Sequence, residues 1–146
     1  MKRTSSDESY ILDLIEHLLD EKCRRQARFD GLLGDEGHTK RRLRLPVDGY
    51  FSEHNLIVEY MEKQHSEPVA VMDNRMTISG CPRGRQRQLY QERKRRYAAD
   101  NGYLYLEVDY RSFEHFANGR LRRNHECDTM LLRTVLMALI VKCTSR

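Results

Sequence analysis

Hydrophobic residues near the start and the end of the chain recur at helical spacing. An apolar stripe at i, i+3 and i+4 follows the capping-box signature Ser5-Ser6-Asp7-Glu8, which predicts a helix over about residues 6–24. The stripe consists of Ile11, Leu14, Ile15, Leu18 and Leu19. Asp128 precedes a second apolar stretch and predicts a final helix that continues to about residue 142.

The middle of the chain has the pattern of strands. Residues 43–51 and the run that begins at Leu56 have strand character, and the four residues between them predict a turn and therefore a hairpin. Pro46 indicates an edge position or a bulge in the first of these strands. Residues 28–30 and 76–79 predict two short strands, and the glycine-rich, charged residues 31–42 predict a loop.

An arginine-rich helix follows and returns the chain to the sheet. It runs from about residue 83 to Asn101-Gly102, with Tyr90 and Tyr97 on the side expected to pack on the sheet, and a strand follows over residues 103–110. We therefore expect an α/β fold with a mixed central sheet, formed by an antiparallel hairpin plus a parallel crossover strand and flanked by helices. Residues 1–146 form one predicted domain, with its core over about residues 6–110 and a C-terminal helix over 128–143.

Composition narrows the class of protein. The 146 residues are 39% hydrophobic and 33% charged, with a net charge of +4, which favours a very polar globular domain over a disordered chain. The four cysteines show no CxxC spacing, which argues against a zinc site and favours a reducing, cytoplasmic location. No apolar signal segment begins the chain, and Arg133 and Thr134 interrupt its longest apolar run, so we expect no membrane partner.

Two carboxylates mark the predicted hairpin. Asp48 lies within its first strand, and Glu59 follows three core-like residues in the second, "LIVEYMEKQH". Two neighbouring carboxylates repel one another unless a cation lies between them, and Mg²⁺ or Mn²⁺ is one solution. The alternative is that both acids are solvated or paired with arginines. Strand alternation puts Lys63 and His65 on the Glu59 face, where they could position water or a scissile phosphate.

The stretch "PVDGYFSEHNLIVEYMEKQH" resembles the core of the PD-(D/E)xK nuclease superfamily, and is most similar to the branch of very-short-patch-repair endonucleases. Asp48 matches the first acid, Val58-Glu59 the second, and Gln64-His65 the closing pair; the similarity covers about residues 8–110. It implies a restriction-endonuclease-like fold and metal-dependent hydrolysis of phosphodiester bonds in DNA. Asp48 and Glu59 would be the ligands of Mg²⁺ or Mn²⁺.

The resemblance also raises three open points. It implies a further acid from the first helix, for which Glu8 is the best match, although Glu8 is also the natural capping-box residue and we favour the cap. The family's catalytic lysine is expected two residues after Glu59, where this chain has Met61. Lys63 could replace that lysine, or Glu62 and Gln64 could form an E-x-Q variant of the motif. Without a replacement, the protein would be a catalytically decayed nucleic-acid-binding protein on the same fold.

Basic residues gather in clusters around the predicted acids. Arginine and lysine clusters bind phosphates, although a single basic run is more often a solvated helix face. The residues expected to contact DNA are Arg83, Arg85, Arg87, Arg93, Lys40 and Arg41, and a third cluster includes Arg120 and Arg123. Cutting both strands of a duplex would favour a homodimer. A structural domain whose acids only pair with arginines is the interpretation from another functional class.

Overall fold

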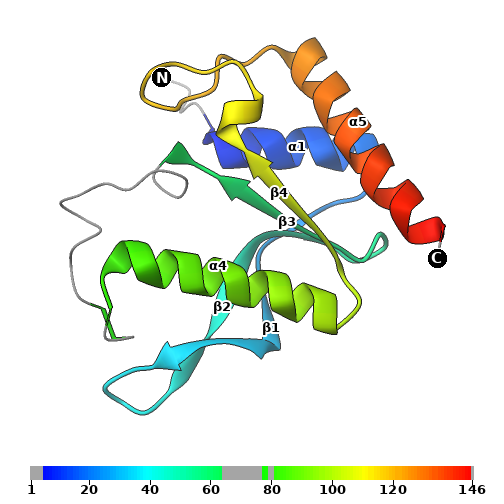
Figure 1. The fold of residues 1–146 in the computed structure, drawn as a ribbon. Coiled ribbons are helices and arrows are strands. Elements are labelled where there is room, and N and C mark those ends of the chain that lie inside the picture. The colour runs from blue at the N-terminus through cyan, green and yellow to red at the C-terminus, as the bar shows by residue number, and fades with distance from the viewer. Residues whose placement is uncertain (1–4, 64–76, 79–80, 146) are drawn as a thin grey trace.

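A computed structural model describes residues 5–63, 77–78 and 81–145. Within these ranges the chain forms α1 (Asp7–Leu19), β1 (Arg24–Glu36), β2 (Arg42–Phe51), β3 (Leu56–Met61), α4 (Arg83–Asp100), β4 (Leu104–Asp109), the short 3₁₀ helix η1 (Tyr110–Ser112) and α5 (His125–Thr144). Figure 1 shows these elements in one mixed α/β arrangement around an open sheet. No helix in the described ranges is both long and apolar enough to cross a lipid bilayer.

The four strands lie in the order β1-β2-β3-β4. β1 pairs with β2 and β2 with β3 in antiparallel fashion, while β4 pairs with β3 in parallel. α4 connects the two parallel strands as a crossover helix. The expected mixed sheet, with an antiparallel hairpin and a parallel crossover strand, is therefore confirmed.

Helices cover both faces of the sheet (Figure 1). α1 and α5 pack on one face, where Val58 and Leu132 belong to one buried cluster. α4 packs on the other face, where Val47, Ile57 and Ala98 are buried together. The tyrosines expected on the sheet-facing side of α4 are partly buried against this second cluster, as predicted.

The first and last helices differ from the predicted bounds. α1 ends at Leu19 rather than near residue 24, because Asp20 adopts a left-handed conformation and its N–H bonds to the carbonyl of Glu16. α5 begins at His125, with Asn124 as its cap, because the Asn124 side chain accepts a hydrogen bond from the N–H of Cys127. Asp128 is buried inside the first turn and is not the N-cap residue, although its side chain accepts a hydrogen bond from the N–H of Asn124.

The largest error concerns residues 24–36, which form one long strand instead of a short strand and a loop. The glycines that suggested a loop allow α4 to approach closely. A Cβ on Gly34 would lie 3.1 Å from the hydroxyl of Tyr90, and one on Gly31 would lie 3.0 Å from the ring of Tyr97. The strand predicted at 76–79 is absent at residues 77 and 78, and its other residues lie outside the described ranges.

Candidate active site

The two predicted metal ligands lie on neighbouring strands at the edge of the core. Glu59 of β3 is buried, with 3% of its surface exposed. Asp48 of β2 is only partly buried, and its Oδ2 accepts a hydrogen bond from the backbone N–H of Tyr60 at 2.8 Å. Burial and then the charge of Asp48 raise the pKa of Glu59 to about 8. The hairpin therefore brings the two carboxylates together, as the sequence predicts.

A lysine from α4 completes this pair. Lys94 Nζ lies 3.1 Å from Glu59 Oε1, and both side chains are largely buried. The ammonium group lies within hydrogen-bonding distance of the carboxylate, and its charge opposes the rise in the pKa of Glu59 that burial and Asp48 cause. Met61, at the position expected for the family's lysine, lines the same cavity as Lys94.

A cavity of about 510 Å³ opens in front of these side chains, between the sheet and α4. Its lining includes Asp48, Glu59, Met61, Arg85, Arg87 and Lys94. The acids and the lysine thus share one cavity with two arginines from the start of α4. The cavity therefore has carboxylates that can bind a cation and basic side chains that can bind a phosphate next to that cation.

Glu8 interacts electrostatically with Asp48 and does not form a capping box. The cap of α1 is Ser6, whose hydroxyl accepts a hydrogen bond from the N–H of Ser9, while Glu8 Oε1 accepts from Gln26 Nε2 at 3.0 Å. The capping interpretation of Glu8 is therefore wrong. Burial, Asp48 and Glu62 raise the pKa of Glu8 to about 7. Glu8 is thus within electrostatic reach of the site, as expected of an additional acid.

Lys63 does not share the Glu59 face, so that prediction is wrong. β3 ends at Met61, and the strand alternation does not extend beyond it. Lys63 Nζ donates to the carbonyl oxygen of Ala117 at 2.8 Å, and Lys63 lines a different cavity together with Glu62. The variant motif of Glu62 and Gln64, and the role of His65, remain predictions because Gln64 and His65 lie outside the described residues.

The four arginines of α4 that were expected to contact DNA divide into two groups. Arg85 and Arg87 line the cavity, and Arg83 is exposed at the first turn of the helix. Arg93 instead donates to the carbonyl oxygen of Leu33 at 2.9 Å and to Asp35 at 2.8 Å. Arg93 therefore holds α4 against β1, and its predicted contact with DNA remains untested.

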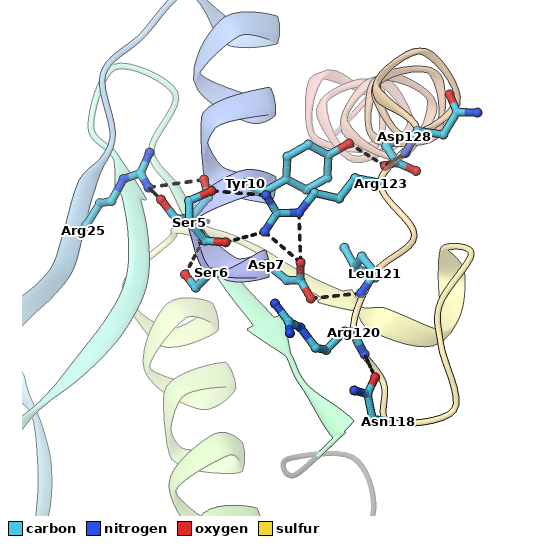
Figure 2. Close-up of polar contacts among 12 residues, drawn as sticks. Ser5, Ser6, Asp7, Tyr10, Arg25, Asn118, Arg120, Leu121, Arg123 and Asp128 are labelled. Carbon is cyan, nitrogen blue, oxygen red and sulfur yellow. Dashed lines mark hydrogen bonds and ion pairs between the residues drawn. The ribbon is translucent and has the colours of Figure 1, made fainter. Parts of the chain in front are cut away.

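The third basic cluster is partly used within the fold. Figure 2 shows Arg123 between Ser5, Asp7 and Tyr10 at the start of α1. Arg123 forms an ion pair with Asp7 at 3.1 Å and lies over the ring of Tyr10. Asp7 also accepts a hydrogen bond from the N–H of Leu121 at 3.0 Å. These contacts tie the segment before α5 to the N-terminus of α1.

The donor set fits a hard divalent cation. In the described part of the chain, no three His, Cys, Asp or Glu side chains are grouped closely enough to hold a metal ion. Mg²⁺ needs only one or two carboxylates and takes its other ligands from water and phosphate. Burial and then the charge of Asp48 raise the pKa of Glu59, and a bound cation would favour the ionised form of both carboxylates.

Two contributors escaped the sequence analysis. Lys94 lies four residues after Tyr90 and three before Tyr97, so it belongs to the stripe of α4 that faces the sheet. A lysine on a helix face that packs against the sheet is the sequence feature that could have identified Lys94 as a site residue. Gln26 has a left-handed backbone with φ of 51°, an unfavourable conformation for a residue other than glycine, beside the Glu8 carboxylate. No pattern in the sequence marks Gln26.

Comparisons of the chain with models of protein families, with curated proteins and with solved structures find no match.

Proposed function

We propose that the protein is a metal-dependent endonuclease that hydrolyses phosphodiester bonds in DNA, on a fold of the PD-(D/E)xK, restriction-endonuclease-like type. The observation that carries this proposal is the buried pair of Glu59 and Lys94 beside Asp48. A largely buried lysine and carboxylate beside a second carboxylate are costly to maintain in a purely structural role, because Lys94 and Glu59 lose most of their hydration. The same groups are useful where a phosphate reacts.

In this proposal Asp48 and Glu59 hold Mg²⁺ or Mn²⁺, and Glu8 supports them from α1. A bound divalent cation supplies Lewis-acid stabilisation of the phosphoryl group and lowers the pKa of a coordinated water. Lys94 takes the place of the lysine expected at Met61. Its ammonium group donates hydrogen bonds and positive charge to the attacking water or to a phosphate oxygen.

The cavity's arginines give the site its preference for a polyanion. Arg85 and Arg87 line the cavity from the start of α4, and Arg83 lies exposed beside them. Arginine binds phosphate oxygens through a planar fork of N–H donors. These residues therefore position the DNA backbone, and a homodimer would place one such site on each strand.

The runner-up function is a nucleic-acid-binding protein on the same fold whose catalysis has decayed. Met61 stands where the family's lysine is expected, and Lys63 is directed to Ala117, which favours this alternative. The two proposals share the basic residues and differ in what Lys94 does. Both predict DNA binding that weakens as salt rises, because phosphate contacts release counterions.

The test is the nicking of a supercoiled plasmid with Mg²⁺, Mn²⁺ or EDTA. The Asp48→Asn variant keeps an acceptor for the N–H of Tyr60 and removes the charge, and Asp100→Asn is the matched control on exposed α4 surface. Metal-dependent nicking that Asp48→Asn loses and Asp100→Asn retains supports the nuclease. Equal nicking by wild type and Asp48→Asn indicates a contaminating enzyme, and binding without nicking supports the decayed protein.

A further inference from the structure

The hairpin of β1 and β2 extends beyond the rest of the sheet. β2 pairs with β3 from Gly49 to Phe51, whereas the pairing of β2 with β1 continues to Arg42. Residues 42–47 pair with β1 alone, and this two-stranded ribbon bends away from β3 (Figure 1). Breaks in register on β1 after Arg28 and after Leu33 indicate bulges, which increase the twist of such a ribbon.

The base of the ribbon is held firmly by α4. The hydroxyl of Tyr90 accepts a hydrogen bond from the N–H of Asp35 at 2.9 Å. Arg93 binds the Leu33 carbonyl and the Asp35 carboxylate from the same helix. These contacts fix the ribbon relative to the cavity as far as Asp35, so its tip has a defined position relative to Asp48.

The tip is a tight turn that places a lysine in a strained position. Lys40 N–H donates to the Gly37 carbonyl at 2.9 Å, and Gly37 N–H donates to the Arg41 carbonyl at 3.3 Å. Lys40 has φ of 55°, in the left-handed position that glycine usually takes in a three-residue hairpin loop. A side chain in this conformation lowers stability, so the turn would be more stable with glycine.

The tip is also the most basic exposed part of the hairpin. Every residue from 38 to 44 is exposed, including Lys40, Arg41 and Arg42, which form no ion pair with any residue in the described ranges. Arg44 pairs with Asp30, whose side chain is almost fully exposed. Leu43 is 72% exposed among these cations. Concentrated positive charge with one apolar side chain suits a groove lined by phosphates, where bases are also within reach.

We propose that the ribbon tip, residues 36–44, enters the major groove of duplex DNA and makes the protein a duplex-binding protein. The major groove admits a two-stranded ribbon, and the right-handed twist of such a ribbon follows it. Arg41 precedes the first residue of β2 and lies seven residues before Asp48. At roughly 3.3 Å per residue the tip reaches about 23 Å from the acid, or about 7 base pairs. The choice of DNA as ligand rests on the proposed function.

The test compares binding of a labelled duplex and of its single strand, by fluorescence anisotropy in EDTA. Lys40→Ala/Arg41→Ala/Arg42→Ala should weaken duplex binding about tenfold or more, and single-strand binding far less. The matched control removes three exposed cations elsewhere, as Lys22→Ala/Arg133→Ala/Lys142→Ala, and should leave duplex binding close to wild type. Equal losses in the two triple variants, or equal losses on duplex and single strand, would overturn the proposal.

The Lys40→Gly variant distinguishes the effect of the Lys40 charge on DNA binding from its effect on the stability of the fold. It relieves the left-handed strain and removes one cation, so the melting temperature should rise while duplex affinity falls. A rise in melting temperature with unchanged affinity would contradict the ribbon's role. If the wild type never nicks DNA but the ribbon variants lose duplex affinity, the result supports DNA binding by the ribbon and rejects the nuclease function. If the ribbon variants nick and bind DNA as well as wild type does, the result supports the nuclease function and rejects DNA binding by the ribbon. A wild-type protein that binds no DNA rejects both hypotheses.

Discussion

Lys94 Nζ lies 3.1 Å from Glu59 Oε1, inside the cavity that Met61 also lines. The two residues come from α4 and β3, and their contact places an ammonium group beside the second acid of the hairpin. In the superfamily that the hairpin resembles, the lysine is expected on the strand itself. In the nuclease that we propose, the helix that covers the strand would supply this lysine instead. The contact therefore favours an active nuclease over a decayed one.

Lys94→Met should reduce metal-dependent DNA cleavage by about 100-fold or more, in the range seen when a catalytic proton donor or acceptor is lost. Arg96→Met removes a cation from the exposed surface of the same helix and should leave the rate close to wild type. Initial nicking rates at saturating Mg²⁺ measure the effect. Equal rates for Lys94→Met and Arg96→Met would assign Lys94 a structural role only.

Asp48→Asn should weaken Mn²⁺ binding by at least about tenfold, because a ligand carboxylate becomes a neutral amide. The amide oxygen can still accept the hydrogen bond from the N–H of Tyr60, so the strand pairing survives. Titration calorimetry with Mn²⁺ measures the affinity, and Asp100→Asn is the control. Undiminished Mn²⁺ affinity in Asp48→Asn would place the cation elsewhere.

Glu59→Gln should change how the stability of the metal-free protein depends on pH. The pKa of Glu59 in the fold is about 8, above its ordinary value of 4.5, so wild type is penalised as the pH rises through this interval and Glu59 ionises. Glutamine does not titrate. In EDTA, the variant should therefore gain on wild type by on the order of 5 kcal/mol at most between about pH 4 and pH 9.

Urea denaturation of both proteins across this pH range gives the comparison, with Glu53→Gln on exposed surface as the control. Parallel stability curves for wild type and Glu59→Gln would mean that burial and Asp48 do not disfavour the ionised carboxylate.

Asp128→Ala should destabilise the fold by about 3 kcal/mol, because it leaves two donors without their acceptor. Asp128 is buried, and its Oδ2 accepts from the Tyr10 hydroxyl at 2.6 Å and from the Asn124 N–H at 3.0 Å. Figure 2 shows the Tyr10 contact between α1 and α5. Urea midpoints measure the change. Glu126→Ala, on the exposed side of the same helical turn, should cost less than about 0.5 kcal/mol.

An equal effect of Asp128→Ala and Glu126→Ala would show that the buried carboxylate contributes nothing to the docking of α5.

The sequence predicted the features that depend on local pattern. Asp48 and Glu59 could be paired in advance because the turn after Phe51 sets two strands side by side. The crossover from β3 to β4 followed from the helix between two apolar strands. Only residues 28–30 of β1 are predicted as a strand, because Gly31 and Gly34 suggest a loop, whereas their role is to admit the tyrosines of α4. That role depends on packing between elements, which local pattern does not report.

For the site residues too, local pattern predicts some positions, and packing between elements determines the others. Lys63 was placed with Glu59 by extending strand alternation beyond Met61, where β3 ends. Glu8 was assigned two roles because the capping signature and the additional acid coincide, and only the contact with Gln26 separates them. Lys94 lies in a run of basic residues, and its role depends on which side of α4 meets the sheet. Tyr90 and Tyr97 mark that side in retrospect.

The most direct test of the central claim moves the lysine back to the strand. Lys94→Met/Met61→Lys keeps one lysine in the cavity and returns it to the position expected in the superfamily. The account predicts that plasmid nicking with Mg²⁺ is lost in Lys94→Met and recovered, at least in part, in the double variant. Recovery that still requires Asp48 would confirm the shared site. Nicking that survives in Lys94→Met, or that wild type never shows with Mg²⁺ or Mn²⁺, would contradict the account.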